Sequence, residues 1–582
     1  MDTTDGGELF VRALESAGIR TLFTLHGGHL DAIYQAAKDR GLRLVDTRHE
    51  QAAGHAADGW ARVTGQTGVA LVTAGPGLTD CITAIANARL DCVPTLFVAG
   101  AAPLRDAELL PLQGGFDQLA LVTPITKWAH RVTHTHRIPD LVAQALRIAR
   151  SGRPGPVYLE LPIDVLFART DAARVRRPAK VAPDAPPAPP AVAVEQAIAW
   201  LHGAERPAIV VGGGARFAEA AGELTAFAEE TGIPVFSNGR GHGLVPAGHP
   251  LCGRGLPHLA FLGRAGGGGD ADVVLVLGAR LGLFTGHPAH PLIPAAARLI
   301  QVDVCAEEIG RNRDVELGIV ADCREALVAL RAAAKGRRWP EGTAWQQAVR
   351  GVREGHRMLF AQALASESGP VHPYRLVSEI VKRLPQDAIV TADGGETASW
   401  MEMVAEVHAP GRFLSHGYLG CLGTGLPFAL AAQVAHPGSP VLCIVGDGSV
   451  GLNFAEFDTF VRHGLPIVTV IANDGQWGMS AHGQELLFGP GRRVVTDLAP
   501  TRYDLAAAGF GCHAEHVESP RELGPALERA FASGKPACVD VRVDPAVIAP
   551  ITLAMVGAAR APSGGAAPAQ GVRIPYYGDL DA

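Results

Sequence analysis

The sequence predicts an α/β protein built from three doubly wound domains, each with a parallel sheet. A chain of 582 residues is too long for one hydrophobic core. Hydrophobic residues make up 47% of the chain and charged residues 19%, as in compact globular proteins. In three regions, apolar strand-like runs alternate with helix-like segments, which is the pattern of a parallel sheet covered by helices on both faces.

The first domain is expected over residues 1–175. Its predicted strands are TLFTLHG, LRLVDT, GVALVTAG, PTLFVAG and PVYLELP. The proline-rich segment RRPAKVAPDAPPAPPAV that follows is typical of an extended linker.

The second domain is expected over residues 192–335, with strands AIVVGGG, PVFSNG, VVLVLGAR and RLIQVDV. A polar, helix-like connector over residues 345–365 leads to the third domain, residues 366–557. Its predicted strands are AIVTADGG, PVLCIVGDG, PIVTVIANDG and ACVDVRV. Residues 558–582 form a tail rich in Ala, Pro and Gly that ends in GVRIPYYGDLDA.

Charge and composition favour small molecules as partners. The net charge is -7 with no long basic run, which argues against nucleic acids and anionic membranes. The N-terminus is acidic where a signal peptide is basic. The longest uncharged stretch, residues 413–446, is interrupted by glycine and proline and is expected to be core. The nine scattered cysteines suit a reducing cytoplasm and do not suggest zinc.

Acidic residues follow two successive strands of the third domain. Asp447 lies between two glycines after PVLCIVG, and Asn473 and Asp474 end the next strand. A right-handed βαβ unit brings both strand tips to the carboxyl edge of the sheet, where they could clasp one cation. Oxygen ligands favour Mg²⁺ or Ca²⁺, and Mg²⁺ commonly shares its shell with phosphates, which Ser449 and nearby backbone N–H groups could hold. Taken alone, GDG is more often an ordinary turn.

The stretch GDGSVGLNFAEFDTFVRHGLPIVTVIAND resembles the cofactor signature of thiamine-diphosphate enzymes. The resemblance implies aminopyrimidine-binding, central Rossmann-like and diphosphate-binding domains. It also implies that Asp447, the Asp474 side chain and the Gln476 backbone carbonyl bind Mg²⁺. The sequence departs from the family at Asp474, where the usual residue is asparagine. Either the added charge tightens Mg²⁺ binding, or Asn473 takes over the role.

Glu50, in DTRHEQAAGHAADGWAR, follows a predicted strand and opens a helix. The resemblance implies that it is the glutamate that activates the cofactor through the aminopyrimidine ring. Burial beside a neutral ring would raise the pKa of this carboxyl group. An isolated glutamate here would more often be a solvated carboxylate favoured by the helix dipole. Because the family builds its site from two subunits, the resemblance also implies a homodimer or homotetramer.

Within this family, the resemblance runs nearly end to end and is greatest to benzaldehyde lyase, in the group of acetolactate synthases, oxalyl-CoA decarboxylases and 2-hydroxyacyl-CoA lyases. ALVTAGPG, PITKWAHRV and SHGYLG also carry it. It implies a carbon-carbon lyase or carboligase acting on 2-hydroxy ketones or 2-hydroxyacyl-CoA thioesters. The alternatives are an acetolactate synthase or 2-oxoacid decarboxylase, whose carboxylate-binding group the sequence does not reveal, and a noncatalytic thiamine-diphosphate binder.

By the same resemblance, His29 and Gln113 handle the substrate hydroxyl proton, His416 is a further pocket histidine, and Leu422 wedges under the cofactor. Without the family, His29 would simply open a helix, Gln113 would lie on a solvated loop and His416 would be a hydrogen-bonded core histidine. Leu422 would then serve core packing. Further cofactor contacts are implied for Gly395, Glu396, Gly420, Cys421, Gly446, Gly448, Ser449, Trp477 and Met479.

Substrate or lid contacts are expected from Gly28, Ala398, Glu485, Tyr576 and Tyr577. Relative to benzaldehyde lyase, Ala398 replaces a pocket tyrosine, Met479 replaces an alanine, and the tail carrying both tyrosines is an extension. Loss of the tyrosine ring makes an aryl aldehyde substrate less certain. The tail resembles the lids of CoA-using relatives, and the alternative is a disordered tail.

The central domain carries VVGGG and VLGARLG, which are not a full dinucleotide fingerprint. In relatives this domain holds ADP or FAD or stays empty. The glycines could equally be turns, so the nucleotide is left open.

Overall fold

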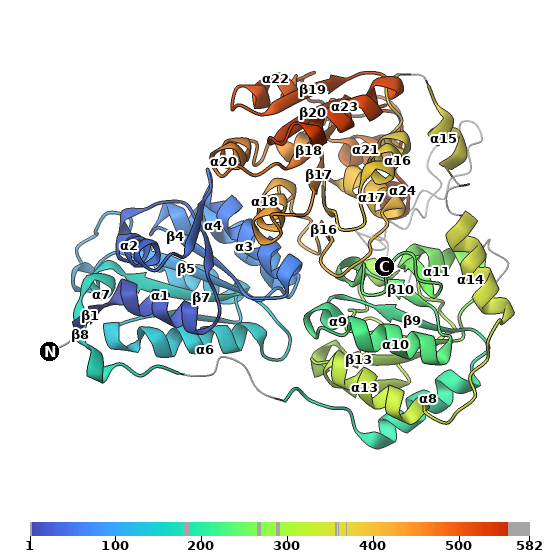
Figure 1. Cartoon of the computed structure of the whole chain (residues 1–582), viewed down its shortest axis with the longest axis horizontal. Helices are drawn as coiled ribbons and strands as arrows, with labels where there is room; N and C mark the ends of the chain where they lie inside the picture. The colour runs from blue at the N-terminus through green and yellow to red at the C-terminus, as the bar shows by residue number, and fades with distance from the viewer. Residues whose placement is uncertain are drawn as a thin grey trace. The chain divides into compact units, whose positions relative to one another are not determined.

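The computed structural model describes residues 3–178, 185–264, 269–286, 292–355, 358, 360–367 and 369–556. They form three six-stranded sheets and a two-stranded antiparallel pair (Figure 1). Two compact units emerge. The first comprises the described residues up to Ala185 with His416–Val441 and Asn453–Ile467, and the second comprises the remainder. The predicted α/β class with three doubly wound parallel sheets is confirmed.

The first sheet has the order β3-β2-β4-β5-β7-β6. Helices α1, α2, α6 and α7 pack on one face around a buried aliphatic core, and α3 and α4 pack on the other. The strands are β2 (Thr21–Thr24), β3 (Arg43–Asp46), β4 (Gly68–Val72), β5 (Thr95–Ala101), β6 (Trp128–Arg131) and β7 (Val157–Pro162). The helices are α1 (Gly6–Ser16), α2 (Asp31–Asp39), α3 (Glu50–Thr64), α4 (Pro76–Leu90), α6 (Ile138–Arg150) and α7 (Ile163–Phe167).

The central sheet has the order β11-β10-β9-β12-β13-β14. One face packs on α8 (Ala191–Gly203), α10 (Ala221–Thr231) and α13 (Cys323–Ala334), and the other on α11 (Leu256–Arg264) and α14 (Ala344–Gly355). The strands are β9 (Pro207–Val211), β10 (Val235–Ser237), β11 (Cys252–Gly255), β12 (Val273–Leu277), β13 (Arg298–Asp303) and β14 (Leu317–Val320).

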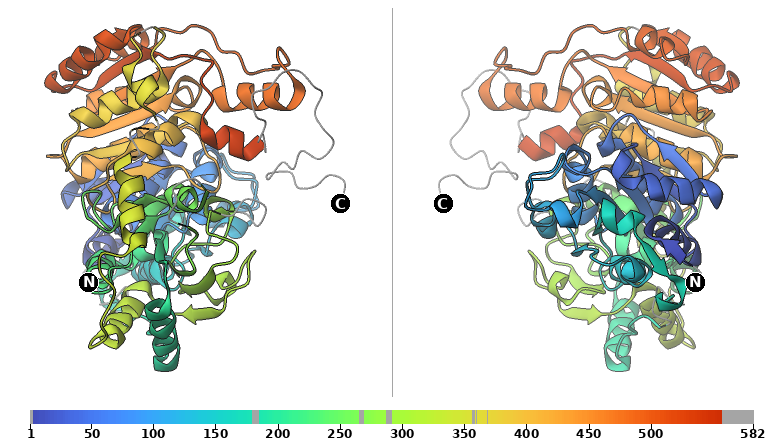
Figure 2. Two further views of the ribbon diagram at one scale, coloured as in Figure 1. Left: turned by 90° about the vertical axis from the view of Figure 1, so that its right-hand side faces the viewer. Right: turned by 90° about the vertical axis from the view of Figure 1, so that its left-hand side faces the viewer.

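The third sheet has the order β16-β15-β17-β18-β20-β19, and its strands, yellow to red, can be followed in Figure 2. Helices α16 (Pro373–Arg383), α17 (Gly395–Val404) and α23 (Pro520–Ala532) share one core with it. The strands are β15 (Ile389–Asp393), β16 (Phe413–Ser415), β17 (Val441–Gly446), β18 (Val468–Asn473), β19 (His513–Val517) and β20 (Ala537–Arg542). Helix α21 (Gly478–Phe488) packs against α24 (Pro550–Val556).

Helix α18 (Gly425–Ala435) lies in the sequence region of the third domain but packs on α3 of the first unit. Its residues Leu426–Val434 are buried throughout, which explains the long uncharged run. Most of that run, including residues 426–434 and 441–445, is buried as predicted, whereas Leu419 and Gly420 are exposed. No helix in the described ranges combines the length and the apolar character needed to cross a bilayer. All nine cysteines lie in these ranges as free thiols.

Each six-stranded sheet reverses its strand order between two inner strands, and in the first and third sheets the last two strands are also interchanged at the edge. The reversal lies between β2 and β4 in the first sheet, β9 and β12 in the central sheet, and β15 and β17 in the third. The loops at the carboxyl ends of these strand pairs diverge to opposite faces, which opens a crevice where α/β sheets bind ligands. The topology therefore offers three candidate crevices.

The strands missed by the sequence analysis are, in the three main sheets, all at an edge: β6, β11, β14, β16 and β19. Edge strands have one open side, so they do not need a continuous apolar run. WAHR and HAEHV, for example, are mostly half-buried. The predicted strands are the buried inner ones, together with β3.

Gly59 marks the closest approach of α3 to α18. A Cβ atom built there would lie 2.9 Å from Cδ1 and 3.0 Å from Cα of Phe428. We expect Gly59→Leu to lower the free energy of unfolding by at least about 1–3 kcal/mol, because the helices would have to separate. Urea unfolding of the full chain measures this.

Gly351, an exposed glycine in α14 with no atom within 4 Å of its Cβ position, provides the control. Gly351→Ala should raise the free energy of unfolding by about 0.4–1 kcal/mol. Equal stability of Gly59→Leu and the unchanged chain would show that α3 and α18 do not pack as described.

Candidate functional site

Three loops meet at the carboxyl edge of the third sheet, after β15, β17 and β18. Gly394, with φ of +97°, has its Cβ position 3.3 Å from both the backbone N of Gly446 and Oγ of Ser449. The loops after β15 and β17 thus touch across the strand-order reversal. At Gly448, a Cβ atom would lie 2.6 Å from the Trp477 ring. Because these glycines have no side chain, the backbone N–H groups stay accessible where a phosphate group would need donors.

Two acidic side chains lie beside these glycines. Asp447 is buried, and its carboxylate accepts hydrogen bonds of 2.9 Å from the N–H groups of Gly448 and Gly475. Burial, followed by the charge of Asp474, raises the pKa of Asp447 to about 8. Burial raises the pKa of Asp474 as well. Neighbouring buried carboxylates repel each other unless a proton or a cation lies between them, so the pair fits a divalent cation with oxygen ligands.

The hydrogen bonds of Asn473 to other residues disfavour it as the metal ligand. Its Oδ1 accepts a 2.7 Å hydrogen bond from Arg542, and its Nδ2 donates to Asp540 at 2.8 Å and to the Thr501 carbonyl at 3.0 Å. Successive residues of a strand face opposite sides, so Asn473 points away from Asp447 when Asp474 points toward it. The extra negative charge of Asp474 therefore stays at the candidate metal site.

Gln476 belongs to the same loop. Its Nε2 donates to Asp474 at 3.1 Å and to the Pro545 carbonyl at 2.9 Å, while its Oε1 accepts from Arg493 at 2.6 Å. Arg493 also donates to both carboxylate oxygens of Glu485. Glu485, expected near a lid, is thus tied to the loop. The backbone carbonyl of Gln476 as a metal ligand stays a prediction.

A second group of possible metal ligands consists of Asp504, His516 and Asp540, whose ligand atoms lie within 4.8 Å of one another. Arg502 donates two hydrogen bonds to Asp504, at 2.8 and 2.7 Å, and His516 is 3.2 Å from Asp540. Arg502 already offsets part of the negative charge of this group. The Asp447 and Asp474 pair is the better cation site.

Other predicted cofactor contacts gather on α17 and α21. A Cβ atom at Gly395 would lie 2.8 Å from Sδ of Met479. Ala398 is buried in α17. Glu396 is buried too, and its carboxylate accepts from Ala549 N–H at 3.1 Å, Thr552 Oγ1 at 2.6 Å and His482 Nδ1 at 3.0 Å. The Glu396 carboxylate therefore binds both the residue just before α24, Ala549, and a residue within that helix, Thr552.

Glu50 is the first residue of α3, as predicted, and is half-buried. Residue His49 caps the helix by accepting a 3.0 Å hydrogen bond from Gln51 N–H. Burial is the main cause that raises the pKa of Glu50, and the charge of Asp80 adds to it. The direction agrees with the expectation for a proton-transferring carboxyl group.

Glu456, which the sequence analysis missed, holds the segment before Glu50. It is fully buried at the start of α20 (Glu456–Arg462). Its carboxylate accepts from Arg48 N–H at 3.0 Å and from Thr459 Oγ1 at 2.6 Å. Burial raises the pKa of Glu456 to about 7. The only sequence signal for it is a glutamate inside the apolar stretch NFAEFDTFV.

His29 and Gln113 lie at the carboxyl edge of the first sheet, in the same unit as Glu50. His29 follows Gly28 in a short 3-10 turn, and its Nδ1 is 3.1 Å from Oγ1 of Thr73, across the reversal between β2 and β4. Burial lowers the pKa of His29, which keeps the ring neutral at pH 7. Gln113 has φ of +59°, rare for a side-chain-bearing residue, and contacts the Cβ position of Gly75 at 3.0 Å.

The segment from His416 to Leu422 is held to the first unit by Asp91. The carboxylate of Asp91 accepts from Tyr418 N–H at 3.0 Å and from Arg62 at 2.8 Å, and a Cβ at Gly417 would lie 2.0 Å from it. Nδ1 of His416 is buried and has no hydrogen-bond partner within the described residues. An unsatisfied polar atom of this kind is suited to a ligand.

The neighbours of Leu422 are also fixed. Gly420 is left-handed, with φ of +64°, and Sγ of Cys421 lies 3.6 Å from Nε2 of His55. The Gly423 carbonyl accepts a 2.6 Å hydrogen bond from Asn453. Leu422 itself is half-buried, which leaves part of its side chain open to a ligand.

The crevice of the central sheet is filled by its own backbone. Gly214 N–H donates to the Gly278 carbonyl at 2.9 Å, and a Cβ at Gly278 would lie 2.6 Å from Gly214 Cα. The glycines therefore allow close contact between the loops after β9 and β12. ADP or FAD in this domain stays a prediction.

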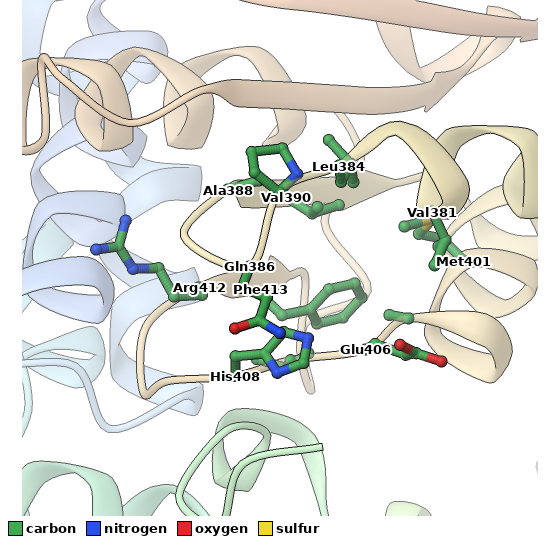
Figure 3. Close-up of a pocket in the computed structure, with 13 residues that line it drawn as sticks. Val381, Leu384, Gln386, Ala388, Val390, Met401, Glu406, His408, Arg412 and Phe413 are labelled. Atoms are coloured by element: carbon green, nitrogen blue, oxygen red, sulfur yellow. The ribbon is translucent and has the colours of Figure 1, made fainter. Parts of the chain in front are cut away.

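A pocket on the third sheet lies away from these residues (Figure 3). It is lined by residues before and at the start of β15 and β16 and by the end of α17, among them Gln386, Met401, His408 and Phe413. It is at the amino edge of the sheet, opposite the edge that carries Asp447. The predicted contacts Tyr576 and Tyr577 lie outside the described residues.

Three successive regions of the chain match domain models of the same enzyme family. Residues 4–121 match the family model of the thiamine pyrophosphate enzyme N-terminal TPP binding domain, residues 194–330 match the central domain, and residues 393–541 match the C-terminal TPP binding domain. A probable acetolactate synthase of Mycobacterium bovis is 36% identical over 94% of this chain and 97% of its own length. The 2-hydroxyacyl-CoA lyase 2 of Bos taurus is 32% identical over 88% of this chain and 84% of its own.

In the absence of metal, replacing the Asp447 carboxylate should change how the stability of the chain depends on pH. Because the folded pKa of Asp447 is raised from 3.8 to about 8, its contribution is complete at low pH and lost as the pH rises through that value. As the pH rises from 3.8 to about 8, the free energy of unfolding of the metal-free chain should fall, and it should fall less in Asp447→Asn. Urea titrations in EDTA measure both.

Saturating Mg²⁺ serves as the control, because it should reduce the fall in the unchanged chain only. If Asp447→Asn and the unchanged chain lost the same stability over this pH range, the two carboxylates would not be neighbours as described.

Proposed function

Because the chain belongs to the thiamine pyrophosphate enzyme family, we propose that it makes or breaks a carbon-carbon bond in 2-hydroxy carbonyl compounds, either 2-hydroxy ketones or 2-hydroxyacyl-CoA thioesters. The observation that supports this choice is that the neutral His29 and Gln113 both contact the loop after β4, His29 at Thr73 and Gln113 at Gly75, on the sheet edge where α3 begins with Glu50. A hydroxyl proton must move when such a bond breaks, and these polar side chains suit that task.

Asp447, Asp474 and the Gln476 carbonyl would hold Mg²⁺, and Ser449 with the glycines of the β15 and β17 loops would receive the diphosphate. The glycine-lined backbone and the mutually repelling carboxylates fit both groups. Bound there, thiamine diphosphate supplies a nucleophilic carbon and an electron sink.

The remaining steps belong to the protein side chains. Glu50, whose pKa is raised by burial, would share a proton with a nitrogen of the aminopyrimidine ring. His29 uses Nδ1 toward Thr73, so Nε2 would exchange the proton of the substrate hydroxyl group. The unsatisfied Nδ1 of His416 would bind the substrate oxygen.

A second candidate is acetolactate synthase, favoured by relatives of that name at 36% and 31% identity over 94% of this chain. Such an enzyme must bind the carboxylate of a 2-oxoacid. None of the candidate pocket residues, Gln113, His29 and His416, is an arginine or a lysine that could bind this carboxylate. A noncatalytic binder is disfavoured because Glu50 is held in place by the buried Glu456 and has a raised pKa.

We also propose a homodimer or homotetramer in which Glu50 of one subunit serves the cofactor held by another, as the resemblance implies. Mixed oligomers test this arrangement. Glu50→Gln and Asp447→Asn subunits, refolded together, should regain turnover that neither parent shows, because one site per mixed pair is intact. No recovery in oligomers isolated through two different affinity tags, one on each variant, would place both residues in one subunit's site.

Substrate class is tested with the holoenzyme in parallel incubations with benzoin, 2-hydroxyisobutyryl-CoA and pyruvate. We expect cleavage of one of the two 2-hydroxy carbonyl compounds. Consumption of pyruvate alone, with acetolactate formed, would favour the second candidate. If none were consumed, the substrate class would be wrong.

Glu50→Gln should lower turnover of the consumed substrate by about 10²–10⁴-fold, since proton transfer is lost, and leave thiamine-diphosphate affinity nearly unchanged. Calorimetry and initial rates measure the two. Asp31→Asn, an exposed position in the same unit, provides the control and should keep both values.

A further inference from the structure

A buried histidine and a buried glutamate join the last described helix to the edge of the third sheet. Glu396 opens α17 and is 4% exposed, and His482 in α21 is 3% exposed. Nδ1 of His482 is 3.0 Å from Oε2 of Glu396, and Nε2 is 2.8 Å from the carbonyl oxygen of Pro545. A backbone carbonyl only accepts hydrogen bonds, and an ionised carboxylate does likewise. Each ring nitrogen therefore faces an acceptor.

The two oxygens of Glu396 accept from the Ala549 N–H, the Thr552 hydroxyl and the His482 ring. With a carboxylate on one side and a carbonyl on the other, we infer that both ring nitrogens of His482 carry protons. The ring is then an imidazolium ion.

The charges around the ring agree with this state. Burial lowers the pKa of His482, but the hydrogen bond and charge of Glu396, the Pro545 carbonyl and the charge of Asp474 outweigh it and raise the pKa. Glu485, on α21, also interacts with this ring electrostatically, and its own partner is Arg493. Tyr374 on α16 interacts electrostatically with Glu396.

His482 is connected to the candidate metal loop through one atom. The Pro545 carbonyl accepts from His482 at 2.8 Å and from Gln476 Nε2 at 2.9 Å. Gln476 Nε2 in turn donates to Asp474 at 3.1 Å. Gly478 lies between the two carboxylates, since its Cβ position is 2.8 Å from Asp474 Oδ2 and 3.1 Å from Glu396 Oε2.

We propose that His482 is a positioning residue whose two N–H groups and positive charge hold the 474–476 loop and the 545–552 segment in the geometry that binds Mg²⁺ and thiamine diphosphate. The inference rests on the proposed function for the identity of these ligands. It also accounts for Asp474, whose extra negative charge has a buried cation nearby. Glu396 then acts indirectly, by orienting the ring and by holding α24.

The charge of the ring can be measured without cofactor. Histidine labelled with ¹³C at Cε1 would be followed by NMR in the full chain, with His482→Gln to assign the signal. We expect the imidazolium shift at pH 7, and loss of the proton at a lower pH in Glu396→Gln, which removes the carboxylate charge. A neutral ring at pH 7 in the unchanged chain would overturn the inference.

Positioning is tested by calorimetric titration of Mg²⁺ in the presence of thiamine diphosphate. His482→Gln should weaken Mg²⁺ binding by about 10–100-fold, as loss of groups that orient metal ligands does. Thr552→Val, which removes one donor to Glu396 with little change in shape, should weaken it less. The control is His513→Gln, because His513 pairs with Glu515 at 2.8 Å on an edge strand of the same sheet.

The outcomes separate the two proposals. Unchanged affinity in folded His482→Gln would overturn this inference alone. If that variant does not fold, unchanged affinity in Thr552→Val would overturn it, and weakened affinity would support it. Absence of cofactor binding by the unchanged chain would overturn the proposed function together with this inference.

Discussion

The buried carboxylate of Asp447 and the half-buried carboxylate of Asp474, neighbours at the carboxyl edge of the third sheet, determine what the surrounding residues must provide. Asp447 and Asp474 follow neighbouring strands, β17 and β18, so the register of the parallel pair brings them together. Their repulsion is tolerable only with protons or a cation present. The local structure meets that need with backbone N–H groups, glycines that expose them, and the protonated ring we assign to His482.

A strand-order reversal occurs in each of the three sheets but is used differently each time. In the first sheet, the reversal between β2 and β4 brings His29 to Thr73. In the third, it brings Gly394 to Gly446 and Ser449. In the central sheet, Gly214 and Gly278 fill the crevice themselves. The fold alone therefore does not decide where ligands bind, because the side chains at each reversal do.

How far the sequence predicts this protein depends on whether an interaction is local. Inner strands and the start of α3 at Glu50 were predicted because burial and helix capping leave local patterns. The interactions of Glu456 with Arg48 and of His482 with Glu396 and Pro545 join residues far apart in the chain, so no spacing rule indicates them. The choice between Asn473 and Asp474 likewise needed the partners of Asn473, namely Arg542, Asp540 and Thr501.

We propose that the paired carboxylates form a cation site through which thiamine diphosphate is held. Calorimetric titration of thiamine diphosphate into the metal-free chain, with and without Mg²⁺, tests it most directly. We expect strong heat of association with Mg²⁺ and little without it, and none in Asp447→Asn under either condition. Equal binding with and without Mg²⁺, or unimpaired binding in Asp447→Asn, would contradict it.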